Sequence, residues 1–533
     1  NPLRRIPAEI FSLKHLRTLV LDGIGLTRLP GRIGRFAHLQ QGTHESLTQG
    51  FHYTVRDFRL MVSVTLRGDD LPLPPLQGLN LRPDPAFLTL YPRPGGPGPS
   101  SVLPFPSWRE GKRVVPRPAA AGPAAPFLPA TNCIGCHDAQ VADEASAMVQ
   151  PGEHGDLLAN LSPYSEWSAS LMGLSGRDPV FHAQLESEKA LRPQLAAFLD
   201  NTCYRCHGVA GQRQLQLDLQ RPFTHNLIYA SGDHPLARYG ALARDGVTCT
   251  ACHHIAAAGL GQESTFTGQF ALGPADVIYG PFSDAVKDQP MRQALGLRPQ
   301  GAEHMRSSAL CGSCHSVILP QVPLGYRGDP SQDASLGREH EQTTFLEWRA
   351  SAYAGAGGQS CQGCHMPEHF QTGQAGRGVV TLVTKIASIE EFLPNVPSSL
   401  PAAEITLSPR PYRRHTLVGL NVWALQLFRQ FPRVLGIPAG DPLVDAPSGK
   451  RFLSNLLLAQ RESLALAERS AQVEIVGTPQ RDAGHLSALV RVVNLAGHKL
   501  PTGVGFRRAY LELQVHDGAG HEKGGHDVWG ERR

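Results

Sequence analysis

Five copies of one pentapeptide, Cys-x-x-Cys-His, constrain this chain more than any other feature. They stand at Cys133/Cys136/His137, Cys203/Cys206/His207, Cys249/Cys252/His253, Cys311/Cys314/His315 and Cys361/Cys364/His365. The chain has 10 cysteines, and each belongs to one of the copies. At these Cys and His frequencies only about 0.01 copies are expected by chance. Any fold for this sequence must therefore accommodate five such motifs.

The spacing inside each motif suits the covalent attachment of one haem. Two thiols can add to the two vinyl groups of one porphyrin, while the adjoining His presents a ring nitrogen to the iron from the same face. We therefore expect five haem c groups, carried by the ten cysteines through thioether bonds. His137, His207, His253, His315 and His365 are the expected proximal iron ligands.

Zinc, disulfide and redox-dithiol sites are the alternatives to haem. Structural zinc sites pair two Cys-x-x-Cys units about 12–20 residues apart, whereas these motifs begin 70, 46, 62 and 50 residues apart and one would be left over. A disulfide framework requires neither the His nor the fixed gap, and a thioredoxin-like dithiol needs one motif rather than five. The pattern favours haem.

The occupant of the second axial position on each iron decides between electron transfer and catalysis. A second His or a Met saturates the iron, whereas an open position leaves room for a substrate. We predict His304, His415 and His498 as distal ligands, and expect His415 to open an amphipathic helix and His498 to lie on a turn beside strands. Further candidates share the remaining places: His154, His182, His225, His234, His254, His340, His369 and Met172.

Length and composition indicate an ordinary globular chain with several parts. Its 533 residues suggest two to four domains, and 55 Gly with 44 Pro indicate many turns. The net charge is only +4 and the sequence has no strong basic or acidic run, so nucleic acid is not an expected partner. No run reaches the roughly 18 apolar residues of a membrane helix, so we expect membrane association only through partners or a missing segment.

The first quarter of the chain differs from the rest. In residues 1–40, "LRRIPAEIFSLKHL" and "LTRLPGRIGRFAHL" align at a period of 23, which resembles a leucine-rich repeat although such repeats need at least about three copies to bury a core. Residues 41–130 are too rich in proline for regular structure and are expected to form a linker or unrelated sequence joined to the remainder. The chain starts with Asn and ends just after a strand-like run, so we expect a fragment at both ends.

The remaining residues predict a mainly helical and irregular haem region followed by a small β-module. Residues 131–370 carry the motifs, and short helices with loops suffice to wrap five haems. Residues 371–470 contain two runs with helical periodicity that would complete the haem domain. Residues 471–533 alternate in the two-residue manner of strands, which predicts a truncated β-sandwich.

Several segments resemble a family of bacterial multihaem c-type cytochromes related to the tetrahaem cytochromes of ammonia oxidisers. The resemblance covers about residues 130–530 and lies in "EWSASLMGLSGRDPVFHAQL", "GVTCTACHH", "HMRSSALCGSCH", "EQTTFLEWRASAY", "SCQGCHMP", "RRHTLVGLNVW" and "NLAGHKLPTGVGFRRAYLELQV". It implies a periplasmic or extracellular electron carrier, often with a β-module beside the haems. The N-terminal quarter departs from this pattern.

Two functions follow from these expectations. The first is electron transfer through five haems between redox partners, or to a terminal acceptor, outside the cytoplasm; haem c maturation places the protein there, although no export signal is visible. The alternative is an oxidoreductase that acts on a small nitrogen or sulfur oxyanion at one haem with an open coordination position. No catalytic residue is assigned. Pentahaem nitrite reductases usually carry Lys in the active motif, whereas all five motifs here end in His.

Overall fold

A computed structural model describes Thr18–Val20, Gln41–Thr43 and most of residues 126–528, with its longer gaps at 140–147, 388–406 and 438–450. The chain divides into two compact units. One comprises Asn1–Val62, Ile475–Val490 and Glu512–Asp527, and the other comprises Ser63–Glu474, Arg491–Leu511 and Val528–Arg533. All five motifs belong to the second unit.

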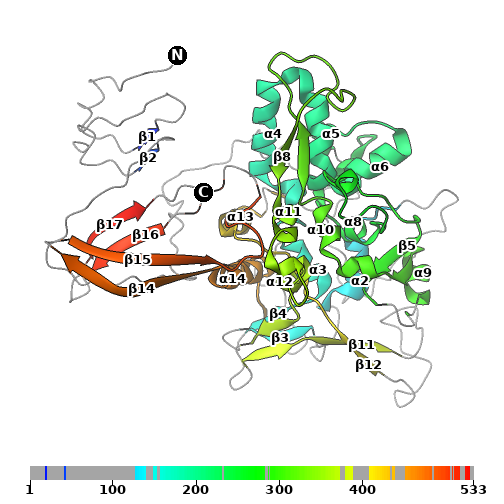
Figure 1. Cartoon of the computed structure of the whole chain (residues 1–533). Coiled ribbons are helices and arrows are strands. Elements are labelled where there is room, and N and C mark those ends of the chain that lie inside the picture. Colours follow the sequence, from blue (N-terminus) through cyan, green and yellow to red (C-terminus); the bar gives the residue numbers. More distant parts are fainter. Residues whose placement is uncertain are drawn as a thin grey trace. The chain divides into compact units, whose positions relative to one another are not determined.

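The second unit combines short helices with small sheets (Figure 1). Its α-helices are α2 (Ile134–His137), α3 (Pro163–Ser168), α4 (Pro179–Leu191), α5 (Ala196–His207), α6 (Val209–Leu219), α7 (Ala237–Arg244), α8 (Cys249–His253), α9 (Gln289–Leu295), α10 (Ser308–Gly312), α11 (Thr344–Arg349), α12 (Cys361–His365), α13 (Val422–Gln430) and α14 (Asn455–Glu468). The 3-10 helices η4 (Ala130–Cys133), η8 (His225–Tyr229) and η10 (Glu303–Arg306) adjoin residues discussed below. The predicted pattern of short helices and loops agrees with this mixture.

The strands pair in small ladders. Antiparallel pairs join β3 (Val149–Pro151) to β4 (Leu157–Asn160), β7 (Val317–Pro320) to β8 (Arg338–Gln342), β9 (His369–Gln371) to β10 (Val379–Thr381), and β11 (Val383–Ala387) to β12 (Leu407–Pro411). Parallel pairs join β5 (Val277–Gly280) to β6 (Arg298–Gly301) and β13 (Arg451–Phe452) to β4. The sequence pattern predicted none of the strands β3 to β13, because each is only two to five residues long.

The C-terminal strands form two separate ladders among the described residues. β14 (Ala471–Asp482) pairs with β15 (His485–Asn494), and β16 (Leu511–His516) pairs with β17 (Glu522–Val528). The alternating sequence predicted strands here, and strands are present. Their assembly into a sandwich remains a prediction.

Near the N-terminus, β1 (Thr18–Val20) pairs in parallel with β2 (Gln41–Thr43). Thr18 lies opposite Gln41, so partners are 23 residues apart, the period seen in the sequence. Parallel strands at the repeat period are what stacked leucine-rich repeats would give. Other residues of segments 1–40 and 41–125 lie outside the described part, and the repeat itself stays a prediction.

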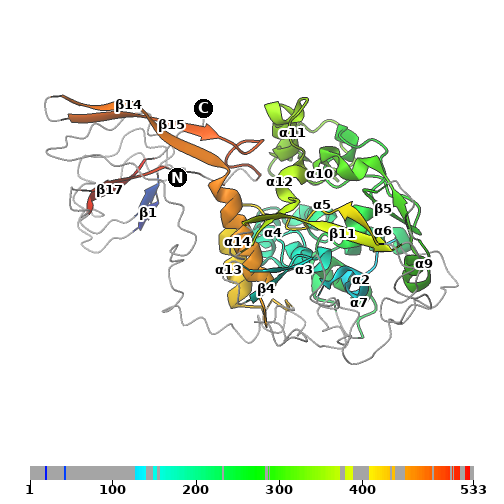
Figure 2. The same cartoon turned by 90° about the horizontal axis from the view of Figure 1, so that it is seen from below.

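Two apolar clusters organise the region around the motifs. One contains Leu425 and Phe428 of α13 with Leu456 and Ala459 of α14, and Figures 1 and 2 show these two helices side by side. The other brings together residues in or near different motifs: Phe127, Val209, Ala210, Leu242, Ala251, Ile255 and Phe270, with Leu310 and Cys314 packed against them. Burial of this second cluster holds the second, third and fourth motifs in one place.

Candidate haem-binding site

Hydroxyl caps start the helices of three motifs. Thr248 Oγ1 accepts a hydrogen bond from Ala251 N at 3.1 Å, and Ser360 Oγ accepts one from Gly363 N at 3.2 Å. Ser307 Oγ likewise accepts from Ala309 N at 3.2 Å, at the start of α10. A Ser or Thr in this position satisfies a free N–H of the first turn and fixes where the helix begins. In the third motif the cap thus places both cysteines and the His on one short helix, α8, and in the fifth motif it does the same on α12.

Two proximal rings are held so that Nε2 is left for a metal. Nδ1 of His253 lies 2.5 Å from Tyr279 O, and Nδ1 of His365 lies 2.8 Å from Val418 O. A carbonyl oxygen only accepts, so Nδ1 carries the proton in each ring and Nε2 keeps its lone pair. Such a bond to Nδ1 is the usual support of a histidine that ligates a metal. The donor set therefore fits an iron at Nε2.

His207 and His315 are supported differently. The His207 ring lies flat against Phe181, with 3.8 Å between ring centres and 2° between planes. Its Nδ1 is buried and has no hydrogen-bond partner among the described residues. Nδ1 of His315 lies 3.3 Å from Gln342 Nε2. Burial lowers the pKa of both rings to about 4, so each is neutral at physiological pH, as a metal ligand must be.

The first motif is only partly described. Burial, followed by the charge of His253, lowers the pKa of His137. The side chain of Cys136 lies outside the described part.

Thiols of different motifs are neighbours. The contact with Cys133, together with burial, raises the pKa of Cys249 well above its ordinary value, and the contact with Cys206 does the same for Cys314. Cys361 is the corresponding neighbour of Cys311: their contact raises the pKa of the Cys311 thiol and lowers that of Cys361 to about 7. These contacts link the first motif to the third, and the second and fifth to the fourth.

The third and fourth motifs are linked through Cys252. Cys252 contributes to the raised pKa of Cys311 in the fourth motif. Burial, and then Cys314 of the same motif, raises the pKa of Cys252. Imidazole neighbours repeat the other links: His253 acts on His137, His315 on His207, and His365 on His315. The fourth motif is thus the junction. It adjoins the second and fifth motifs directly, and it adjoins the third motif, which in turn adjoins the first.

Hydrogen bonds between the motif segments agree with these links. Thr250 Oγ1 of α8 both accepts from Leu128 N and donates to Leu128 O, at 3.2 Å each, beside η4 of the first motif. Ser308 Oγ of α10 accepts from Cys361 N at 3.0 Å. Between the second and fourth motifs, Gly268 N donates to Ser313 O at 2.8 Å, and a Cβ on Gly268 would come within 2.9 Å of Arg205.

His415 lies beside the first and third motifs, but it does not open a helix. Helix α13 begins only at Val422, where the Asn421 side chain caps it, and Leu417 has a positive φ of 46° that interrupts any helix before it. The apolar periodicity of the sequence continued across this break, which is why the prediction placed His415 on the helix. Burial, then His253 and His137, lowers the pKa of His415 to about 3.

The free nitrogen of His415 is Nε2. Its Nδ1 lies 3.1 Å from the carbonyl oxygen of Arg413, so the ring has the same tautomer as the two proximal rings described above. A buried ion pair fixes its backbone: Glu166 Oε2 accepts from His415 N at 2.9 Å, while Glu166 Oε1 accepts from Arg414 Nε and Nη2 at 2.8 and 2.6 Å. Glu462 also pairs with Arg414 at 2.8 Å.

His498 lies next to His365 in the turn that follows β15, as the sequence predicted. Their ring centres are 6.4 Å apart and their planes differ by 11°. Two imidazoles on opposite sides of one metal ion, with metal–nitrogen bonds of about 2 Å, place their ring centres about 6 Å apart. Nδ1 of His498 lies 2.9 Å from Lys499 O, so its Nε2 is the nitrogen with the lone pair. The pair fits a shared iron.

A second carboxylate holds the turn of His498. Glu347 Oε2 on α11 accepts from Lys499 N at 3.0 Å and from Thr502 Oγ1 at 2.7 Å. Tyr353 OH donates to Leu495 O at 2.9 Å on the other side of the turn. The turn is thereby fixed relative to the fourth and fifth motifs.

His304 is placed less favourably for ligation. Its Nε2 lies 2.7 Å from Ile255 O, two residues after proximal His253, and its ring meets Tyr279 edge on at 5.0 Å. The carbonyl occupies Nε2, so only Nδ1 could bind a metal without rearrangement. Its role as a distal ligand stays a prediction.

Three further histidines are engaged with protein on both nitrogens. His254 contacts Thr250 O and Ala275 O. His182 and His225 bond to each other and form part of a buried polar chain beside the second motif. The sequence offered these two only as additional ligand candidates, and nothing in its local pattern signalled the chain.

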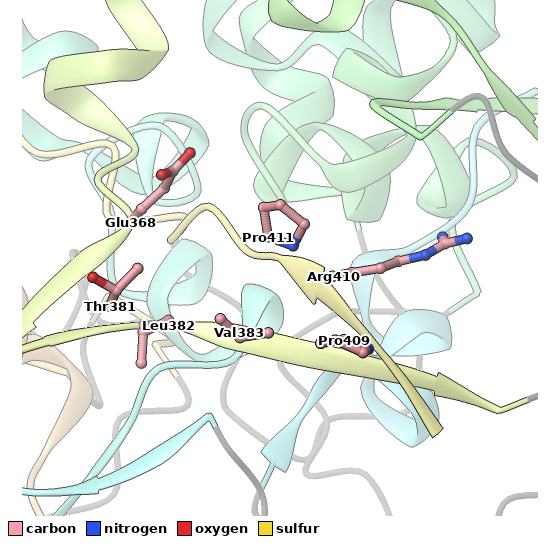
Figure 3. Close-up of a pocket in the computed structure, with 7 residues that line it drawn as sticks. All are labelled: Glu368, Thr381, Leu382, Val383, Pro409, Arg410 and Pro411. Atoms are coloured by element: carbon pink, nitrogen blue, oxygen red, sulfur yellow. The ribbon is translucent and has the colours of Figure 1, made fainter. Parts of the chain in front are cut away.

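One surface hollow of about 360 Å³ lies near the fifth motif but is lined by no residue of it. Its lining is Glu368, Thr381, Leu382, Val383, Pro409, Arg410 and Pro411, from β10, β11, β12 and the segment before β9. Figure 3 shows the Arg410 side chain extending away from Glu368, and its guanidinium stacks on Phe282 at 4.7 Å. With no thiol or imidazole in its wall, this hollow is not the haem site.

Comparison with known proteins gives one distant structural likeness. No family model and no curated protein sequence matches the chain. A penta-heme cytochrome c552 from Thermochromatium tepidum is similar in structure, with a TM-score of 0.39 and 16% identity over 76% of this chain and 74% of that chain. Among the described residues, no helix is both long and apolar enough to cross a membrane.

Proposed function

We propose that this chain is a multihaem c-type cytochrome that passes electrons through five covalently bound haems between redox partners outside the cytoplasm. The observation that carries the proposal is the chain's use of all ten cysteines in five attachment motifs. The neighbouring positions of these motifs support it, because an electron route needs close cofactors. Bound haem would supply a one-electron iron couple at each motif.

The protein residues hold and order the array. Thiols at each motif would anchor one macrocycle, and the proximal imidazoles would bind through Nε2, with the Nδ1 bonds of His253 and His365 fixing the ring orientations. His498 would close the opposite face of the iron bound by His365, and His415 would serve the first or third motif. The contacts between thiols suggest that electrons reach motifs two, three and five through the fourth.

Saturated coordination favours a carrier over an enzyme. A distal imidazole leaves no position for a substrate. His415 lies beside the first and third motifs and His498 beside the fourth and fifth, so each could close one iron. A pure carrier further requires distal ligands at the other three irons. Electron paramagnetic resonance of the fully oxidised protein at low temperature tests this function. Five low-spin irons are expected. One high-spin iron that binds added nitrite or sulfite would instead support the oxidoreductase with an open coordination position.

A further inference from the structure

A chain of hydrogen bonds runs from the surface of α4 into the protein beside the second motif. The Glu186 side chain is 57% exposed and bonds to Nδ1 of His225, whose side chain is only 3% exposed. Nε2 of His225 lies 3.1 Å from Nδ1 of His182, and Nε2 of His182 lies 3.2 Å from Gly176 O. The two rings are stacked, with centres 5.1 Å apart and planes 9° apart.

The three links Glu186–His225, His225–His182 and His182–Gly176 need one proton more than two neutral rings can provide. The Gly176 carbonyl only accepts, so Nε2 of His182 must carry a proton, and the link between Nδ1 of the same ring and Nε2 of His225 then needs a proton on His225. The third link, from Nδ1 of His225 to Glu186, needs a further proton. It can come from an imidazolium or from a protonated carboxyl. Without it, two acceptors face each other at one of the two links that His225 makes, and that link is lost.

Opposing forces act on that proton. Burial lowers the pKa of His225 from 6.5, whereas the bond to Glu186 and the charge of Glu186 raise it. Burial, followed by His225, lowers the pKa of His182 to about 3. The hydrogen bonds therefore favour the proton and burial opposes it, so a modest change in nearby charge can shift its occupancy.

The groups that face His225 come from three elements. They are Glu186, His182 and Lys189 of α4, Asp200 and Tyr204 of α5, and Tyr229 of η8. Lys189 lies between the two carboxylates, 3.0 Å from Glu186 and 3.2 Å from Asp200, so its charge is largely offset. Tyr229 OH lies 3.2 Å from Nε2 of His225 and can donate to it or accept from it, depending on the tautomer of the ring.

The hydrogen-bonded residues Glu186, His225 and His182 adjoin the second motif through Phe181. This residue precedes His182 on α4 and lies flat on the His207 ring at 3.8 Å. Tyr204, on the same helix as Cys203 and His207, lies 3.5 Å from Nδ1 of His182. A negative charge added at a metal bound to His207 would act across this short, buried region, where electrostatic effects are strong.

We propose that Glu186, His225 and His182 form a proton-uptake site that binds one proton from solvent when the haem of the second motif accepts one electron. The electron comes from the redox donor of the array and reduces the iron from the ferric to the ferrous state. The proton enters at Glu186 and completes the third link of the chain, so the added charge is balanced. This inference rests on the proposed function.

Spectroelectrochemical titration of the protein with its haems attached, at several pH values, tests the site. One midpoint potential should fall with rising pH near and below pH 6.5, approaching about 59 mV for each tenfold change in proton concentration. Glu186→Gln and His225→Gln should remove this dependence. Glu188→Gln, at a carboxylate of the same helix that accepts a hydrogen bond from Gln184, should retain it.

Each outcome separates the two proposals. A pH dependence that survives both Glu186→Gln and His225→Gln, or the absence of any dependence in the parent protein, overturns the proton-uptake site while leaving electron transfer intact. A chain without reducible haem overturns the proposed function itself. Because Glu186 is exposed and the change to Gln is small, that variant should fold even if His225→Gln does not. An infrared difference spectrum between reduced and oxidised protein should show a carboxyl or imidazole signal that Glu186→Gln abolishes.

Discussion

The substitution Glu166→Gln tests the buried ion pair that holds His415. Glu166 is 5% exposed and accepts three hydrogen bonds: two from Arg414 and one from the backbone of His415. Glutamine has one carbonyl oxygen, so its NH₂ group must face either the guanidinium or the backbone N–H, both of which are donors. The variant therefore loses hydrogen bonds and leaves the Arg414 charge without its main partner.

The expected cost follows from the burial of the pair. Removing one partner of a buried ion pair destabilises a protein by about 3–5 kcal/mol. Glu462 remains 2.8 Å from Arg414 and its side chain is 17% exposed, so part of the charge stays compensated. We expect about 3 kcal/mol, the lower end of that range, which is about two powers of ten in the folding equilibrium.

Guanidinium chloride unfolding followed by circular dichroism measures this loss. Glu474→Gln is the matched control, because Glu474 pairs with Arg491 at the surface, where the side chains are 37% and 58% exposed. Surface pairs contribute about 0–1 kcal/mol, so the control should change little. Equal losses in the two variants would refute the reasoning that burial makes the Glu166 pair important.

Three further predictions concern the motif segments. Burial raises the pKa of Asp245 from 3.8 to about 6. A carboxyl whose pKa is raised by folding stabilises the folded state below the unfolded-state pKa, and this stability is lost as pH rises through the folded-state pKa. The free energy of unfolding should therefore fall by up to about 3 kcal/mol from pH 4 to 7, and Asp245→Asn should remove that part of the pH dependence. Gly312→Ala should cost about 1–3 kcal/mol by thermal or denaturant unfolding, because its Cβ would lie 2.6 Å from Phe345, whereas Gly363→Ala, with its nearest atom at 3.5 Å, should be tolerated; equal effects would contradict the close packing of α10. Glu347→Gln should loosen the turn of His498, and optical spectra should then show a high-spin component that a control at exposed Glu474 lacks.

The sequence predicted the chemistry of the motifs but could not predict how they adjoin. Each Cys-x-x-Cys-His is a local pattern, and the Ser or Thr before Cys249 and Cys361 also marks the helix start locally. The neighbours Cys206 and Cys314 are far apart in the sequence, and Cys314 packs against the cluster that contains Phe270. Their contact depends on tertiary packing, for which a single sequence carries no direct signal.

The same limit applies to the distal histidines. His498 was predicted on a turn and is found there, because the strand before it and the Gly-containing turn are both local features. His415 was placed on a helix because the apolar period runs through it, yet its backbone is fixed by Glu166, 249 residues away. The segments containing Glu166 and His415 lie far apart in the sequence, and the ion pair of Glu166 with Arg414 that joins them depends on the fold.

An intact-mass measurement of the mature protein, combined with a haem assay in alkaline pyridine, tests the central claim most directly. Five haems attached to each chain through its ten cysteines are expected, and no cysteine should react with a thiol reagent after denaturation. Fewer than five haems, reactive thiols in any motif, or zinc in place of iron would contradict it.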